Sequence, residues 1–398
     1  MSARLSVIHN AAVEAGAARI EEILTENDKL SRELLAVNAD AVDQERRFPR
    51  ENLDALARSG IFGLLVPATY GGAGAGLPEM SQVVERMGQA CASTAMITLM
   101  HFCGTAVLAA TAPPKLKDAI LPAIARGEHL TTLAFSEPGS GGHFYCPISQ
   151  VLTNDGKMRL SAQKSFVTSA GEADSYVVST RSASAKAATD VDLFLVDAAA
   201  DGLTVAGQFD GLGLRGNASA PMKLQNVATS EEMRIGAEAS GFQTMLQVVL
   251  PHFQIGAASV FLGMAQSAME KTAAHLNSRK YEHLGGTPMA QIPRAQFLMG
   301  EMALELRSTR AYLGETIRRA VSGDSEAVLD ILGIKARAAD ACVAVVSRAM
   351  TACGGTAYGR KGGLERIFRD AQAAPIMAPA TDLLKEFLGK ASLGLPLF

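Results

Sequence analysis

The spacing of apolar residues changes twice along this chain, and these changes constrain its fold more than any other feature. Up to about residue 129 the apolar positions recur at helical spacing, for example over residues 20–41. Short strand-like segments follow, with a turn signal at Asn154-Asp155-Gly156. Helical spacing then returns. The sequence predicts a mostly α protein with an inserted β domain, divided into an N-terminal α-helical domain (1–129), a middle β domain (130–240) and a C-terminal helical bundle (241–398).

Composition narrows the class of protein. The chain has 398 residues, 48% of them hydrophobic and 19% charged, which is typical of a globular protein with an ample core. A net charge of -3 argues against nucleic acid as a partner. The five cysteines have no metal-type spacing, so we expect reduced thiols, no metal site and a cytoplasmic location. The apolar run 92–110 is interrupted by polar residues and favours a buried helix over a membrane span.

The segment 135–143 has the composition of a ligand-binding loop. It combines one acidic residue, a proline and a run of small residues between Phe135 and His143. Glycine allows the backbone to approach a ligand closely, and Pro138 fixes the turn. Ser136 offers a hydroxyl and a backbone N–H to the polar edge of a planar heterocycle. The segment therefore predicts contact with a flat ring.

Six stretches, in the same order, resemble motifs of the acyl-CoA dehydrogenase family. Together they span nearly the whole chain, although several positions depart from the family pattern. The stretches are Ser136-Glu137-Pro138-Gly139, Pro67 with Tyr70-Gly71-Gly72, residues 162–174, Gly213-Leu214-Arg215-Gly216, Gly263-Met264-Ala265 with Arg279-Lys280, and Gly354-Gly355 with residues 365–371.

The resemblance implies an architecture and a cofactor. It implies an N-terminal α-helical domain, a middle β-barrel domain and a C-terminal four-helix bundle. It also implies bound FAD, a homotetramer built as a dimer of dimers, and an acyl-CoA or other apolar small-molecule substrate. An electron acceptor or a flavin reductase would be the protein partner, with neither nucleic acid nor membrane involved.

Residues of the β domain are the first candidates for FAD contact. In the family, the loop that matches Phe135 and Ser136 lies against the flavin, as do the aromatic and threonine that match Phe166 and Thr168. An ordinary strand with Phe166 turned inward is the alternative. Thr381 takes the place of a flavin-side threonine if the alignment is shifted by one residue.

Three further candidates belong to the C-terminal domain. The family's counterpart of Arg279 reaches the FAD of a neighbouring subunit, and an arginine fork suits a pyrophosphate. A helix-end arginine that complements the helix dipole is the alternative. Gly354 and Gly355 resemble a loop that also contacts FAD from a second subunit, or they simply end a helix.

The usual catalytic base of the family is missing from this sequence. Most members carry a glutamate where Ala378, or Pro379 with a one-residue shift, stands here. A minority place it on the first helix of the C-terminal domain, where Phe253 stands next to Gln254. Gly142 also replaces the family's serine in the ligand loop. Neither known position offers a group that accepts a proton.

Histidines are the candidate replacements, because a histidine can act as a base near neutral pH. His143 belongs to the ligand loop, whereas His101 lies on an apolar helix where a core role is the alternative. His252 could instead face solvent, and Asp382 could only complement a helix dipole. Ala95 and Leu99 are expected to line the acyl cavity, since the matching helix does so in the family.

Three functions remain open at this point. The first is an FAD-dependent, acyl-CoA dehydrogenase-like oxidoreductase with an unusual or absent base. The second is a flavin-dependent monooxygenase on the same fold, using reduced flavin and oxygen. The third is a non-catalytic descendant that keeps the fold and FAD, because a fold alone does not determine chemistry.

Overall fold

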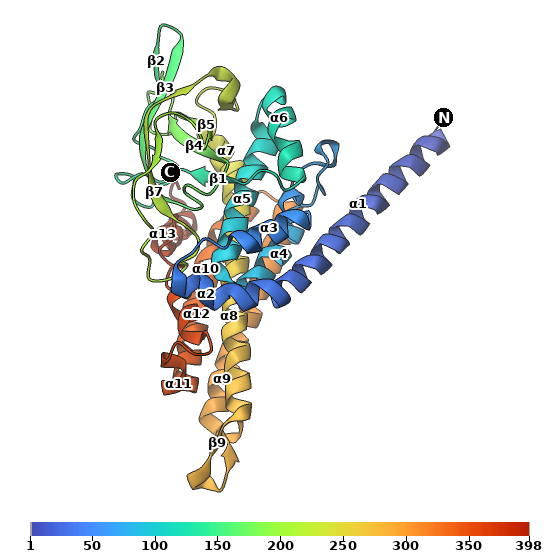
Figure 1. Cartoon of the computed structure of the whole chain (residues 1–398), viewed down its shortest axis with the longest axis vertical. Helices are drawn as coiled ribbons and strands as arrows, with labels where there is room; N and C mark the ends of the chain where they lie inside the picture. Colours follow the sequence, from blue (N-terminus) through green and yellow to red (C-terminus); the bar gives the residue numbers. More distant parts are fainter. Residues whose placement is uncertain (1, 398) are drawn as a thin grey trace.

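The computed structural model describes residues 2–397, with side chains from residue 16 onward, and its elements follow the predicted helical, β, helical order. The N-terminal part is helical, and α1 extends away from the rest of the molecule (Figure 1). A π-helical segment, Ser31–Leu35, joins α1 to α2. The helices are α1 (Ser2–Leu30), α2 (Ala36–Glu45), α3 (Arg50–Arg58), α4 (Leu77–Ala90), α5 (Ala92–Thr111) and α6 (Pro114–Ala125).

The middle part contains two four-stranded sheets, ordered β1-β4-β5-β8 and β2-β3-β7-β6. The pair β1–β4 is parallel and the other pairs within these two sheets are antiparallel. Strand β3 has two irregularities against β7, the second between Lys164 and Val167, where the cavity described below begins. The strands are β1 (Thr131–Ala134), β2 (Leu152–Asn154), β3 (Lys157–Val167), β4 (Ser175–Arg181), β5 (Val191–Asp197), β6 (Leu203–Val205), β7 (Ala220–Thr229) and β8 (Arg234–Ile235).

The C-terminal part is again helical, with three long helices that pack on one another. A small hairpin of β9 (Lys280–Tyr281) and β10 (Thr287–Pro288) lies at the end of the bundle far from the sheets (Figure 1). The helices are α7 (Gly241–Thr244), α8 (Leu250–Ser278), α9 (Pro293–Val321), α10 (Ala327–Cys353), α11 (Gly355–Tyr358), α12 (Leu364–Ala371) and α13 (Thr381–Ser392).

Small residues bring the two helical parts into direct backbone contact. A Cβ added at Gly263 of α8 would lie 2.2 Å from the carbonyl oxygen of Glu85 on α4, and one at Gly88 of α4 would lie 2.6 Å from that of Val260. Such spacing excludes any larger side chain. The helices α4, α5 and α8 therefore form one continuous core beneath the sheets.

Two helical stretches, Ala92–Thr111 and Gly241–Ser278, are long and apolar enough to cross a membrane. In each, 78% of the most apolar window is buried inside the protein, as in the core helices of soluble proteins that pass the same test. These two helices are therefore only weak evidence for a membrane span.

Candidate flavin and substrate site

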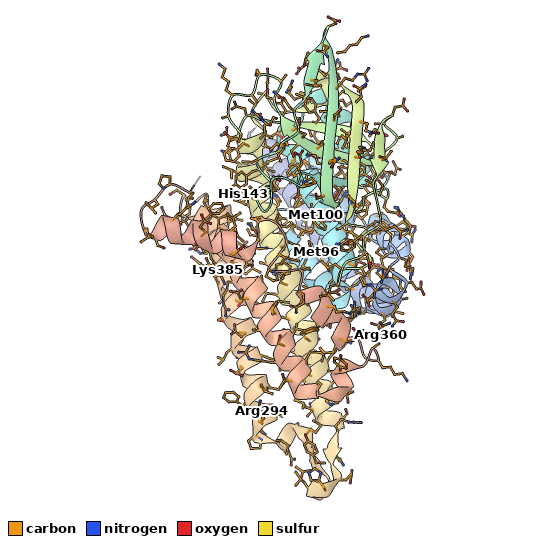
Figure 2. All side chains as sticks on the ribbon, turned by 90° about the vertical axis from the view of Figure 1, so that its left-hand side faces the viewer. Met96, Met100, His143, Arg294, Arg360 and Lys385 are labelled. Carbon is orange, nitrogen blue, oxygen red and sulfur yellow. The ribbon has the colours of Figure 1, made fainter. Side chains whose placement is uncertain are left out.

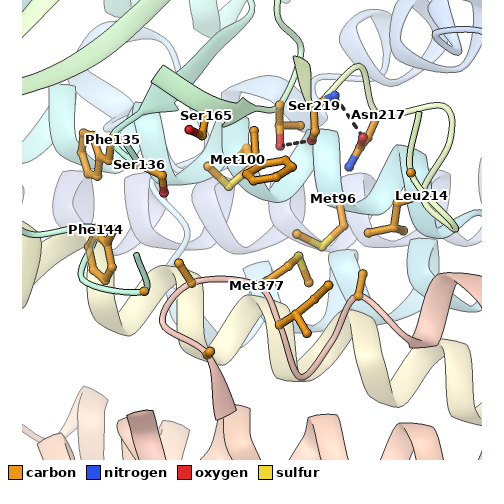
Figure 3. Close-up of a pocket in the computed structure, with 18 of the residues that line it drawn as sticks. Met96, Met100, Phe135, Ser136, Phe144, Ser165, Leu214, Asn217, Ser219 and Met377 are labelled. Carbon is orange, nitrogen blue, oxygen red and sulfur yellow. Dashed lines mark hydrogen bonds between the residues drawn. The ribbon is translucent and has the colours of Figure 1, made fainter. Parts of the chain in front are cut away.

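One cavity of about 670 Å³ lies where the β domain meets the helices. Its walls come from α5, the loop after β1, the end of β3, the loop before β7, the start of α8 and the segment around α12 and α13 (Figure 3). The residues that the argument uses are Met96, Met100, Phe135, Ser136, Phe166, Thr168, Arg369, Met377 and Ala378.

The part of this cavity that Met96, Met100 and Met377 line forms an apolar chamber (Figure 3). Met96 and Met100 of α5 lie at the junction of the β domain and the helices (Figure 2), and with Met377 they point into the cavity (Figure 3). The predicted helix therefore lines the chamber, but the predicted residues do not. Ala95 and Leu99 are fully buried outside the lining, because residues one position away project from a different side of a helix.

Phe166 does not turn inward as an ordinary strand residue would. It lines the cavity, is 74% exposed and has a positive φ of 52°. A positive φ is uncommon outside glycine, and a bulky residue held in this region marks local strain. An exposed aromatic ring at a cavity edge is a surface that a flat ring can cover. The structure thus disfavours the inward alternative.

Hydroxyl groups surround the same part of the cavity. Thr168 is buried and its Oγ1 lies 3.1 Å from Oγ of Ser219, and Ser136 lines another stretch of the same cavity wall (Figure 3). Phe135 lies parallel to Phe144, with 6.4 Å between ring centroids. Thr381, next to the cavity-lining Ala380, has a buried Oγ1 without a hydrogen-bond partner. An unpaired buried hydroxyl next to a cavity that also exposes an aromatic ring fits a bound flavin.

A buried ion pair holds the ligand loop in place. Lys164 is 0% exposed at its side chain, and its Nζ donates to Oε1 of Glu137 at 2.7 Å and to the carbonyl oxygens of Phe135 and Ser179 at 3.2 and 2.6 Å. Burial alone would raise the pKa of Glu137, but Lys164 and the hydrogen bonds of Ser149 outweigh burial and lower it. Glu137 is therefore ionised, and its carboxylate is bonded to Lys164 and Ser149 although the residue lines the cavity.

The structure brings none of the three candidate histidines into the cavity lining. His101 is fully buried, donates from Nε2 to the carbonyl oxygen of Phe62 at 3.1 Å and accepts the Thr131 N–H at Nδ1. Burial lowers its pKa to about 4, so it is a neutral core residue. His252 bonds the Val248 carbonyl through Nδ1, and burial lowers its pKa. His143 is exposed beside Tyr145.

Comparison with known proteins identifies the fold and its family. Models of the acyl-CoA dehydrogenase N-terminal, middle and C-terminal domains match residues 19–128, 132–227 and 239–393. The chain belongs to the acyl-CoA dehydrogenase family. Cyclohex-1-ene-1-carbonyl-CoA dehydrogenase of Geobacter metallireducens is 28% identical over 380 residues, which cover 93% of this chain and 99% of that protein.

Solved structures of low sequence identity share this fold. Butyryl-CoA dehydrogenase from Megasphaera elsdenii superposes with a TM-score of 0.88 at 21% identity, covering 94% of this chain and 98% of that one. The FAD complex of PigA has a TM-score of 0.87 at 20% identity, covering 94% and 97%. Family membership and the fit of the cavity agree on FAD as the cofactor.

Neither position that the resemblance gives for the family's base carries a carboxylate in this cavity lining. Among the described residues that line the cavity, the ionisable ones are Glu137 and Arg369. Of the two residues that the resemblance aligns with the glutamate, Ala378 lines the cavity and Pro379 does not. Phe253 lines the wall, while Gln254 is fully buried and both its amide atoms lack a partner.

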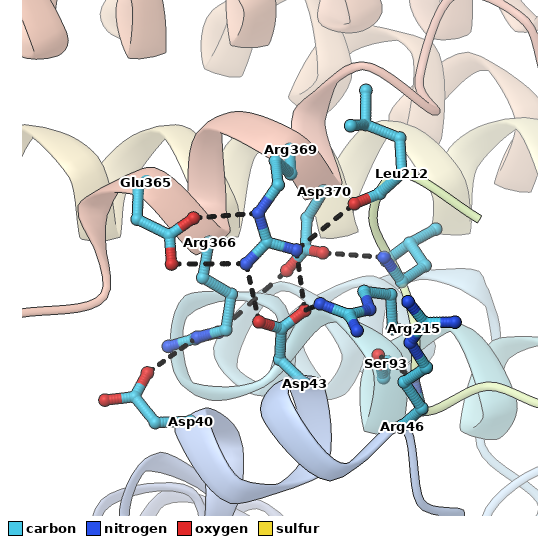
Figure 4. Close-up of polar contacts among 12 residues, drawn as sticks. Asp40, Asp43, Arg46, Ser93, Leu212, Arg215, Glu365, Arg366, Arg369 and Asp370 are labelled. Carbon is cyan, nitrogen blue, oxygen red and sulfur yellow. Dashed lines mark hydrogen bonds and ion pairs between the residues drawn. The ribbon is translucent and has the colours of Figure 1, made fainter. Parts of the chain in front are cut away.

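Arg369 is committed to an ionic lock between α12 and α2 (Figure 4). Its guanidinium bonds both carboxylate oxygens of Asp43 at 2.8 and 2.5 Å, and Glu365 at 2.8 Å. Asp370 accepts the Leu214 N–H at 2.6 Å, and burial raises its pKa to about 6. The cluster joins α2, α12 and the loop at Leu214 around the cavity mouth. Its role is to hold the wall.

Arg279, Gly354 and Gly355 are exposed at the ends of α8 and α10, outside the cavity lining. Gly354 has a φ of 57° and ends α10, as the helix-end alternative requires. Contact of these residues with the FAD of a neighbouring subunit stays a prediction, as does the homotetramer.

Proposed function

We propose that this protein is an FAD-dependent oxidoreductase that desaturates an apolar acyl-CoA thioester between its α and β carbons. The observation that carries the proposal is the cavity itself. The hydroxyl-bearing residues Ser136 and Thr168 line the same cavity as the methionines of the chamber. Membership in the acyl-CoA dehydrogenase family and the names of the relatives support the substrate class.

The chain's own residues have distinct tasks in this proposal. Thr168, Ser136 and Thr381 hold the flavin edge, and Phe166 covers the ring. Bound FAD would supply a hydride acceptor. Met96, Met100 and Met377 hold the acyl chain by apolar contact and exclude water, and the unbranched methionine side chain adapts to irregular ligand shapes. We further propose that an electron acceptor protein reoxidises the cofactor.

The proton-transfer step has no side-chain base among the described cavity residues. Glu137 is neutralised by Lys164, and Arg369 is always protonated. A positioned base contributes about 10²–10⁴-fold to proton transfer. We therefore expect slow desaturation of ordinary acyl-CoAs. The same observation favours a second candidate function, a flavin-dependent monooxygenase, in which substrate deprotonation by a glutamate is not required.

Anaerobic mixing of the FAD-loaded protein with saturated acyl-CoAs separates the two functions. Desaturation predicts bleaching of the visible flavin bands and an enoyl-CoA product detected by mass spectrometry. If no thioester bleaches the flavin, and reduced flavin with oxygen instead yields a hydroxylated product, the monooxygenase is correct. A protein that binds neither FAD nor FMN would exclude both functions and leave the non-catalytic descendant.

The depth of the acyl chamber gives a further prediction. Met100→Trp should fill part of the chamber and raise KM for long acyl chains by about tenfold or more, because each methylene kept out of the chamber loses about 0.8 kcal/mol of burial. Short chains should be affected less. Met100→Leu conserves volume and serves as the control in the same chain-length series. Equal effects on short and long thioesters would show that Met100 does not bound the chamber.

A further inference from the structure

Lys335 is a buried lysine behind the wall of the cavity. It lies on α10, is 0% exposed, and has Leu332, Ile334 and Ala336 as buried neighbours on the same helix. Its Nζ donates to the carbonyl oxygens of Met377 at 2.8 Å and of Pro379 at 2.9 Å. Within the described chain no carboxylate lies at ion-pair distance from it. Burying a charged lysine without a counter-ion is costly, so we expect the buried Lys335 amine to have a function.

The two carbonyl groups lie on either side of Ala378, in a segment that forms part of the cavity wall. Ile376, Met377, Ala378 and Ala380 all line the cavity. The Thr381 N–H donates to the Pro375 carbonyl at 2.8 Å and closes the segment into a loop. Among the described loop hydrogen bonds, no backbone N–H reaches the carbonyl of Met377 or Pro379. Lys335 is thus their protein donor, and both carbonyls would otherwise be left unsatisfied.

The number of donors matches the number of acceptors when the amine is neutral. A lysine ammonium carries three N–H donors, whereas the neutral amine carries two, one for each carbonyl. Burial lowers the pKa of Lys335 to about 7, and Asp382 at the start of α13 opposes this effect. Of the elements packed on α10, which include α8, α9, α12 and α13, only α13 presents a described charge that acts on it. Both protonation states can therefore hold the loop.

We propose that Lys335 is a positioning residue of this site, which clamps the wall segment on both sides of Ala378 and thereby fixes the acyl chamber and the neighbouring Thr381. The inference rests on the proposed function for the identity of the substrate, but not for the clamp itself. Lys335 acts through the backbone of residues 377–379 and touches neither substrate nor cofactor.

The test compares FAD-loaded Lys335→Met with Lys271→Met. Methionine keeps the length of the side chain but removes both donors. Lys271 of α8 is an exposed lysine on a neighbouring helix, and it lies outside the cavity lining. In Lys335→Met we expect KM for the preferred acyl-CoA to rise about tenfold, with a smaller change in kcat, and the visible flavin bands to shift. Lys271→Met should match the wild type in all three.

Two readouts remain valid if no acyl-CoA reacts. The dissociation constant of FAD and the flavin spectrum report on the wall beside Thr381 without turnover. Wild-type FAD affinity and spectrum in Lys335→Met, with unchanged KM where a substrate is known, would overturn the proposal. If Lys335→Met does not fold, Lys335→Gln keeps an NH2 group with two donors on a shorter side chain and should show a smaller change of the same kind.

The pH dependence of unfolding tests whether the buried amine is present as described. The unfolded chain holds the lysine proton up to pH ~10.4, whereas the folded protein releases it near pH 7. Between these values the unfolded state binds more protons, so the free energy of unfolding should gain a positive pH slope of about one proton from Lys335. This contribution should be lost in Lys335→Met and kept in Lys271→Met. Identical slopes in the wild type and Lys335→Met would show that the pKa of Lys335 is not lowered in the folded protein, and the FAD affinity and flavin spectrum then decide whether the clamp exists.

Discussion

Replacing Lys164 with methionine should lower the free energy of unfolding by about 3–5 kcal/mol, as expected when one partner of a buried ion pair is removed. Glu137 would then remain buried without its counter-ion, held only by the Ile148 and Ser149 N–H groups and the Ser149 hydroxyl. The carbonyl oxygens of Phe135 and Ser179 would also lose their donor. Chemical denaturation followed by circular dichroism measures this change.

Lys157 provides the matched control, because it lies on the same strand but is exposed. Lys157→Met should change stability by no more than about 0.5 kcal/mol. The double variant Lys164→Met with Glu137→Gln should recover part of the loss, since no buried charge is then unpaired. A loss below about 1 kcal/mol in Lys164→Met would show that the pair does not anchor the loop.

The second large effect concerns the missing base. Ala378→Glu should increase the rate of flavin bleaching by acyl-CoA about 10²–10⁴-fold, the range that a positioned general base contributes. Ala378 faces the cavity, and Lys335 fixes the carbonyl groups before and after it. A carboxylate introduced there would enter the chamber beside Met377. Anaerobic stopped-flow absorbance measures the rate.

Ala378→Gln is the control, because glutamine has nearly the shape of glutamate but cannot accept the proton. It should leave bleaching at the wild-type rate. Equal rates for Ala378→Glu, Ala378→Gln and the wild type would show that this cavity does not present a thioester α-carbon to position 378. That outcome would favour the monooxygenase over desaturation.

The cavity mouth and the ligand loop are stabilised differently from the chamber. The loop depends on the Glu137–Lys164 pair and the mouth on the lock between Arg369 and Asp43, both of which involve side chains far apart in the sequence. The chamber depends on methionine side chains, which tolerate substitution. Variants in the first two regions should therefore affect folding and FAD retention, and variants in the chamber should affect substrate choice.

The sequence by itself determined the order of helices and strands, because a change between helical and strand spacing is a local property of the chain. It also identified the loop at Ser136, the strand end at Phe166 and Thr168, and the family. These features are recognised from short motifs, whose residues are neighbours in the sequence. The sequence also shows directly that position 378 is alanine and not glutamate.

Only the tertiary structure decided which side chains share the cavity. Ala95 and Met96 are adjacent in sequence, and the packing of α5 selects Met96 for the chamber. His101 is withdrawn into the core by Phe62 and Thr131, which come from other elements. Lys335 gave no signal, because a lysine in a helix is usually exposed. Its burial depends on the loop at Met377, which packs on α10 although the two segments are far apart in the sequence.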